Sequence, residues 1–64
     1  MEFKSLDDIY KHLLKEGAKQ IEFVLSPNRN FYDGEDLVIF YENNNVNYCI
    51  DGNFVNGKWI VKLS

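Results

Sequence analysis

Apolar residues near the N-terminus recur every three or four positions, at Leu6, Ile9, Tyr10, Leu13 and Leu14. This spacing predicts an amphipathic helix over residues 6–16. Ser5 and Asp8 form a capping-box pattern at its start, and Gly17 offers the left-handed residue that commonly ends a helix.

After Gly17 the pattern changes to the period of two that is typical of β-strands. A first strand is expected through residues 21–25, and Pro27 should stop it. Residues 37–41 are apolar at every position, which predicts a central strand covered on both sides. Residues 33–36 and 43–45 have the composition of turns, and further strands are expected over 46–50 and 58–63.

Two dipeptides near the C-terminus, Asp51-Gly52 and Asn56-Gly57, are both typical of hairpin turns. Because they lie so close together, either one is a bulge or residues 53–55 form a very short strand. Residues 51–58 resemble half of one MORN-type repeat, and this resemblance implies a hairpin in the segment.

Together these elements predict an α+β fold in a single domain, residues 1–64. One N-terminal helix should pack on one face of a three- to four-stranded antiparallel meander sheet. The apolar strand residues then divide between two faces, and those expected toward the helix are Ile21, Phe23, Leu25, Ile39, Trp59 and Val61. Those expected on the opposite face are Val24, Val38, Phe40 and Ile60.

One helix can cover only one face of such a sheet, so the second apolar face should be exposed. Exposed apolar surface of this kind commonly marks a protein-binding or self-association site. The alternative is a tightly coiled sheet with Phe31, Tyr32 and Phe54 folded over its back.

The composition indicates in which cellular compartment the protein is expected. Of the 64 residues only Cys49 is a cysteine, so no internal disulfide is expected and a reducing, cytoplasmic location is favoured. The N-terminal residues do not have the pattern of a signal peptide, and no apolar run suits a membrane span. Abundant Asn, Lys, Ile and Tyr indicate an AT-rich genome, such as that of a low-GC bacterium or its phage.

No catalytic or cofactor-binding motif is present. The single histidine, His12, lies between Asp8 and Glu16 on the polar side of the predicted helix, where a solvated position is expected. Cys49 has no basic neighbour in sequence and is expected to be a buried or half-buried, inert thiol. The sequence therefore predicts a protein that is not an enzyme, with no cofactor and no metal site.

The charge distribution favours a protein partner over a nucleic acid. Residues 30–57 contain five acidic residues and no lysine or arginine, within a net charge of −3. A phosphate backbone needs clustered bases, whereas an acidic surface suits a basic protein. A solvated surface that aids solubility is the alternative. The contact residues predicted on this basis are Tyr32, Asp33, Glu35, Asp36, Glu42 and Tyr48.

These observations lead to one main hypothesis: a small acidic protein-binding module that inhibits a bacterial nucleic-acid enzyme stoichiometrically. In size and charge the chain is similar to the phage-encoded inhibitors of host or defence proteins, such as anti-CRISPRs. One alternative is a homo-oligomer that holds a small ligand, such as a nucleotide, between subunits. Another is a structural subunit of a larger assembly, and the second sheet face also allows a homodimer.

Overall fold

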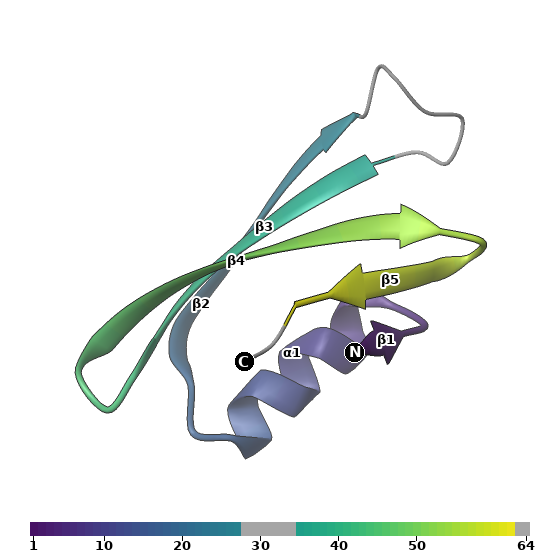
Figure 1. The fold of residues 1–64 in the computed structure, drawn as a ribbon. Coiled ribbons are helices and arrows are strands. Elements are labelled where there is room, and N and C mark those ends of the chain that lie inside the picture. The colour runs from purple at the N-terminus through teal and green to yellow at the C-terminus, as the bar shows by residue number, and fades with distance from the viewer. Residues whose placement is uncertain (28–34, 63–64) are drawn as a thin grey trace.

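The computed structural model describes residues 1–27 and 35–62, which form one helix and five strands. The elements are β1 (Glu2–Phe3), α1 (Leu6–Lys15), β2 (Lys19–Pro27), β3 (Glu35–Asn43), β4 (Val46–Val55) and β5 (Lys58–Val61). The strands form one sheet in the order β1-β5-β4-β3-β2, and all neighbours are antiparallel (Figure 1). The α+β fold is confirmed, and the short β1 gives the sheet one strand more than expected.

Helix α1 begins at Leu6, as the apolar pattern predicted, and ends at Lys15, one residue before the predicted end. The Ser5 hydroxyl accepts a hydrogen bond from the backbone N–H of Asp8 at 3.2 Å, which caps the first turn. Gly17 follows the helix with a φ of 93°, in the left-handed region that glycine tolerates best. No helix within residues 1–27 and 35–62 is long and apolar enough to span a membrane.

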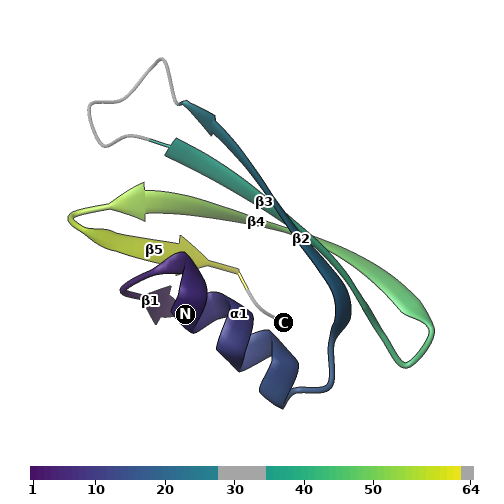
Figure 2. The same cartoon turned by 180° about the vertical axis from the view of Figure 1, so that it is seen from behind.

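The helix lies against one face of the sheet, here called the front face; the opposite face is the back face (Figures 1 and 2). The core between helix and sheet consists of Ile9, Leu13, Ala18, Leu37, Ile39, Trp59 and Val61. Phe23 and Ile21, also expected toward the helix, are half-buried against this core. Leu25 pairs with buried Leu37 on the front face but remains exposed.

The two hairpin dipeptides have different roles. Asn56 and Gly57 have φ angles of 52° and 77° and turn β4 into β5, so the hairpin predicted in this segment is present. Asp51-Gly52, by contrast, forms neither a turn nor a bulge, because β4 continues through it in regular register with β3. A Cβ atom on Gly52 would lie 3.1 Å from the Ile60 carbonyl oxygen and 3.1 Å from Val61 Cγ2. The close packing of β4 against β5 therefore requires a residue without a side chain at position 52.

Three other expectations are corrected. Glu35 and Asp36 belong to β3 and not to a turn. Phe54 does not fold over the back of the sheet, since its ring packs 5.0 Å from that of Trp59 on the front face. β3 is central, but its back side is uncovered, because Phe40 is 42% exposed. Phe31 and Tyr32 lie outside the described residues.

The close approach at Gly52 generates a stability prediction. Gly52→Ala should lower the free energy of unfolding by roughly 1–3 kcal/mol, because the added methyl group overpacks the β4–β5 contact. Asn47→Ala, at an exposed position of the same strand, is the control and should change stability by less than about 0.5 kcal/mol. Urea denaturation followed by Trp59 fluorescence measures both variants. Equal stability of the two variants would show that the contact is not tight.

Candidate protein interface

Four apolar side chains lie on the back face, as the strand alternation predicted. We call Val24, Val38, Phe40 and Ile60 the back-face patch. Val24 of β2 pairs directly with Val38 of β3, and Phe40 follows Val38 on the same face two residues later. Ile60 of β5 lies on the same face beyond β4, since Ile60 pairs with Asn53 and Asn53 with Asp36. The patch therefore extends over both halves of the sheet.

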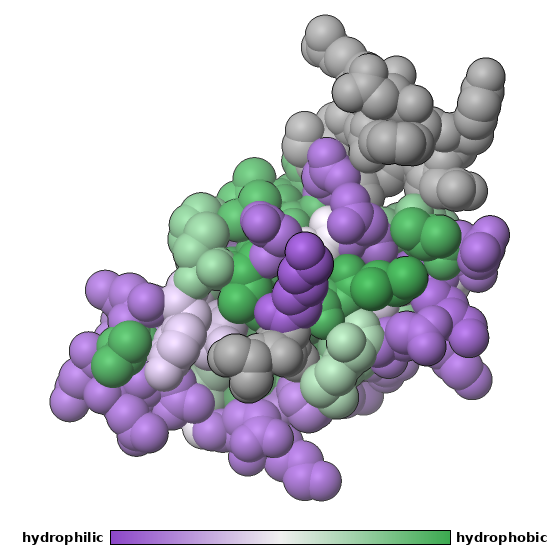
Figure 3. Space-filling model, in the orientation of Figure 1, coloured by the Kyte–Doolittle hydropathy of each residue, from purple (hydrophilic) through white to green (hydrophobic). Residues whose placement is uncertain are grey.

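The back-face patch is open to solvent. Val24 and Phe40 are each 42% exposed and Ile60 is 40% exposed, while Val38 is half-buried between its neighbours. The helix packs on the other face and contributes nothing to covering these side chains. In Figure 3, hydrophobic side chains gather over the sheet, and hydrophilic side chains lie around and between them. Val24, Val38 and Phe40 are neighbours, whereas Asp51 and Asn53 of β4 lie between them and Ile60. Exposed apolar side chains grouped on one face are typical of a binding surface.

Carboxylates lie on the same face as this patch. We call four back-face residues the acidic frame: Glu22, Asp36, Glu42 and Asp51. Glu22 pairs with Phe40, and Asp51 pairs with Val38. Neither β3 nor β4 contains a lysine or an arginine, so the charged residues of these two strands are all acidic. Lys19 lies opposite Glu42, and the backbone of Lys62 is hydrogen-bonded to that of Asp51. Asp36 accepts a hydrogen bond from Asn53 Nδ2 at 2.7 Å, which fixes one carboxylate of the frame.

The contact residues predicted from the sequence do not form one cluster among the described residues. Asp36 and Glu42 share the back face of β3 but are six positions apart, which corresponds to about 20 Å along a strand. Tyr48 lies on the front face, where it pairs with Tyr41. Glu35 begins β3, and Tyr32 and Asp33 lie outside the described residues.

Sequence reasoning did not name Glu22 and Asp51 as candidate contact residues. Residues two apart on a strand share a face, so the alternation that placed Val24 on the back face also places Glu22 there. Asp51 lies on this face because it pairs with Val38. Cys49 was also misplaced: it is exposed and pairs with Phe40, so its thiol lies at the border of the patch. The missing information was which residues of β4 oppose those of β3.

The two tyrosines at the far end of the β3–β4 hairpin form a stacked pair. The rings of Tyr41 and Tyr48 have centroids 5.1 Å apart and an interplanar angle of 15°. This offset stacking is favourable for aromatic side chains. Burial raises the pKa of the Tyr41 hydroxyl above its usual value, and the neighbouring Tyr48 raises it further.

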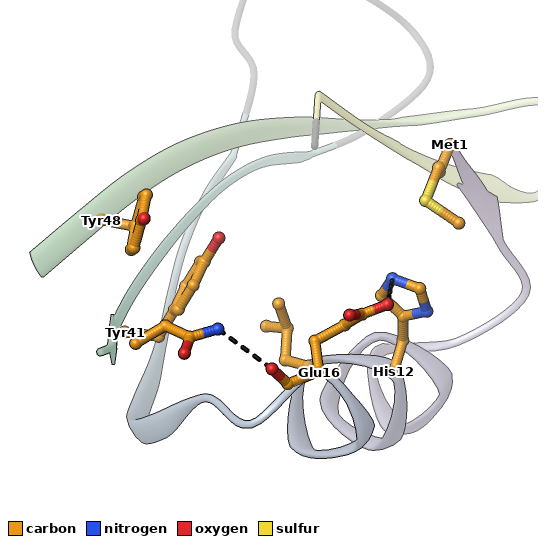
Figure 4. A pocket seen from close by; sticks show the side chains of 7 residues that line it. Met1, His12, Glu16, Tyr41 and Tyr48 are labelled. Atoms are coloured by element: carbon orange, nitrogen blue, oxygen red, sulfur yellow. Dashed lines mark hydrogen bonds and ion pairs between the residues drawn. The ribbon is translucent and has the colours of Figure 1, made fainter. Parts of the chain in front are cut away.

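A cleft of about 440 Å³ separates this tyrosine pair from the helix (Figure 4). Its lining residues are Met1, His12, Leu13, Glu16, Tyr41, Asn43 and Tyr48, and we call it the helix cleft. Asn43 Nδ2 donates a hydrogen bond to the Glu16 carbonyl oxygen at 3.1 Å, which closes its floor.

His12 is not on a fully solvated face, contrary to expectation. Its side chain is 27% exposed, its ring lies 5.5 Å from that of Phe3, and its Nε2 is 3.9 Å from a Glu16 carboxylate oxygen. Strand β1, which pairs with β5, brings Phe3 next to His12. The expectation of a solvated His12 was based on the helix pattern alone, which does not predict the position of β1. No three His, Cys, Asp or Glu side chains come together as a metal site within the described ranges.

A second cleft, of about 360 Å³, lies where β2 separates from the hairpin. We call it the edge cleft; its lining residues are Gln20, Glu22, Phe40, Tyr41, Glu42, Asn47 and Tyr48. The β2–β3 register shifts between Lys19 and Glu22, and Gln20 there has a φ of 54°. A bulge of this kind locally disrupts the pairing of β2 with β3. The cleft joins the back-face patch at Phe40 and Glu42.

No family model, curated protein or solved structure matches this chain. The functional argument therefore rests on the geometry of the back face and of the two clefts.

The two sides of β3 should respond differently to the same substitution. Ile39→Asn places an amide in the core and should cost at least about 3 kcal/mol of stability, enough to unfold a domain of this size. Phe40→Asn, one residue on, leaves its amide in water and should cost only about 1 kcal/mol. Urea denaturation of both variants measures the difference. Similar losses would mean that the back face is also packed.

The tyrosine pair gives a second prediction, measurable by pH titration of the ¹³Cζ resonances. Tyr48→Phe should lower the pKa of Tyr41, yet the pKa should stay above its usual value because burial is the larger cause. Folding raises this pKa, so the neutral Tyr41 hydroxyl contributes to the stability of the fold. This contribution to the free energy of unfolding is complete below about pH 10 and is lost as Tyr41 ionises at higher pH. An unchanged Tyr41 titration in the variant would contradict the contribution of Tyr48.

Proposed function

We propose that this protein is a stoichiometric protein-binding module that docks through its back face. The observation that carries the proposal is the back-face patch, a set of apolar side chains, most of them exposed, on the same sheet face as the four carboxylates of the acidic frame. Such an apolar centre with a polar rim is the usual anatomy of a protein interface.

Phe40 is the natural anchor of this interface. It lies in the middle strand of the described back-face patch, and neighbouring residues hold more than half of its surface. An aromatic side chain that is already held in place loses little entropy on binding, so it can bury apolar area efficiently. Burial of apolar area contributes about 25 cal/mol per Å².

The acidic frame indicates the chemistry of the partner. A basic rim on the partner would pair with Glu22, Asp36, Glu42 and Asp51 and would accelerate association. Proteins that bind nucleic acids have such basic surfaces. We therefore propose a bacterial nucleic-acid enzyme as the target and inhibition by occupation of its basic surface. A phage or mobile-element origin fits this role, and the exposed single thiol of Cys49 suits the reducing cytoplasm.

The same frame argues against the other hypotheses. In a homodimer through the back face, the carboxylates of both copies would meet at one rim, and like charges there are unfavourable. A nucleotide bound on this face would bring phosphates near the same carboxylates. A basic protein partner satisfies both the apolar patch and its frame.

The proposal is tested by capture with matched variants of the full chain. Immobilised wild-type protein, Phe40→Ser and Leu14→Ser are exposed to the lysate of a low-GC bacterium. Leu14 is 48% exposed on the helix, so its variant removes comparable apolar surface from the other side of the molecule. We expect Phe40→Ser to lose a captured protein that wild type and Leu14→Ser retain, with affinity reduced at least about tenfold.

The purified partner then supplies the decisive measurements. It should form a complex of fixed stoichiometry by light scattering, and its affinity should fall with added salt because of the acidic frame. Equal capture by all three proteins, or an affinity that does not depend on salt, would overturn the back-face interface.

A further inference from the structure

The edge cleft combines two features that together suit a planar cation. It lies on the back face, where Phe40 lines it together with its charged lining residues, Glu22 and Glu42. No described lysine or arginine lines it. Aromatic faces attract cations through their electron-rich surfaces, and carboxylates do so by charge.

The register places the two carboxylates within reach of one ligand. Glu22 pairs with Phe40, and Glu42 lies two residues further along β3 on the same face. Such diagonal positions are about 7–8 Å apart between Cα atoms, so both side chains can contact one group between them. Lys19 pairs with Glu42 along the backbone, but it does not line the cleft. Neither glutamate forms an ion pair with another described residue.

The remaining lining groups favour a guanidinium over an ammonium ion. Gln20 and Asn47 add amide oxygens, and the exposed ring of Phe40 adds a flat stacking surface. A guanidinium is planar and has five N–H donors, so it can stack on a ring while it donates to several oxygens at once. An ammonium ion has three donors and cannot stack.

We propose that the edge cleft binds the side chain of an arginine on the partner protein. This inference rests on the proposed function and extends it, since it names one group of the basic partner. The cleft is open: Glu22 and Asn47 are exposed, and Phe40 is 42% exposed. A side chain that reaches in from a neighbouring surface suits this shape better than a small molecule that must be enclosed. The cleft also meets the back-face patch at Phe40, so one partner can occupy both.

The test is a titration of the ¹⁵N-labelled full chain, followed by amide chemical shifts. The probe is N-acetyl-arginine-N-methylamide, which presents the side chain as a protein does. We expect saturable shifts at Glu42, Asn47 and Tyr48 with millimolar affinity. The lysine analogue and the neutral citrulline analogue should bind at least about fivefold more weakly. The proposal would be overturned if the chemical shifts did not saturate at probe concentrations up to about 50 mM, or if the citrulline analogue bound equally well.

Matched double variants locate the site. Glu22→Gln/Glu42→Gln should weaken probe binding roughly five- to tenfold, whereas Asp7→Asn/Asp8→Asn removes the same charge from the helix and should change it less than about twofold. If Glu16→Gln has the larger effect, the probe occupies the helix cleft and the assignment is wrong. Tighter binding of free arginine than of the blocked probe would identify a metabolite site, and saturation by Mg²⁺ or Ca²⁺ at the same glutamates would identify a metal site; either result overturns the proposal.

The two proposals can fail separately. Probe binding in the edge cleft together with unchanged capture by Phe40→Ser would retain the arginine site and reject the back-face interface. Loss of capture in Phe40→Ser without any probe binding would retain the interface and reject the arginine site.

Discussion

The structure depends on a mismatch of areas: one helix of 10 residues covers a sheet of five strands. The core that results lies on the front face alone, where Ile9, Ile39 and Val61 are fully buried. The strands nevertheless have apolar residues on both faces, so the back face remains exposed around Phe40. A small domain gains little stability from such surface, because it is not removed from water by folding. The exposed back face is better explained by binding than by stability.

The charges on the same strands are consistent with this interpretation. Glu22 and Asp51 lie beside apolar residues of the back face, and charged side chains in such positions favour solubility. Acidic residues beside an exposed strand also oppose association with further copies. In the proposed function, the frame keeps the patch available for a partner of opposite charge, and the edge cleft at Phe40 adds a site for a basic side chain of that partner.

Much of this architecture follows from the sequence because local rules decide it. The period of the helix, the cap at Ser5 and the alternation along β2 and β3 are properties of neighbouring residues. What the sequence could not provide depends on contacts distant in the chain. Gly52 resembles a turn residue locally, yet it is required by the backbone of β5. His12 is half-buried only because β1 places Phe3 beside it. The acidic frame and edge cleft likewise depend on register and on the bulge in β2.

The most direct test of the account is the solvent accessibility of the back face in the isolated protein. A soluble nitroxide such as TEMPOL broadens the resonances of side chains that it can approach. In methyl-labelled protein, Val24 and Ile60 should broaden strongly, whereas Ile39 and Val61 should be protected in the core. Equal protection of all four methyl-bearing residues would show that the back face is covered and would contradict the account.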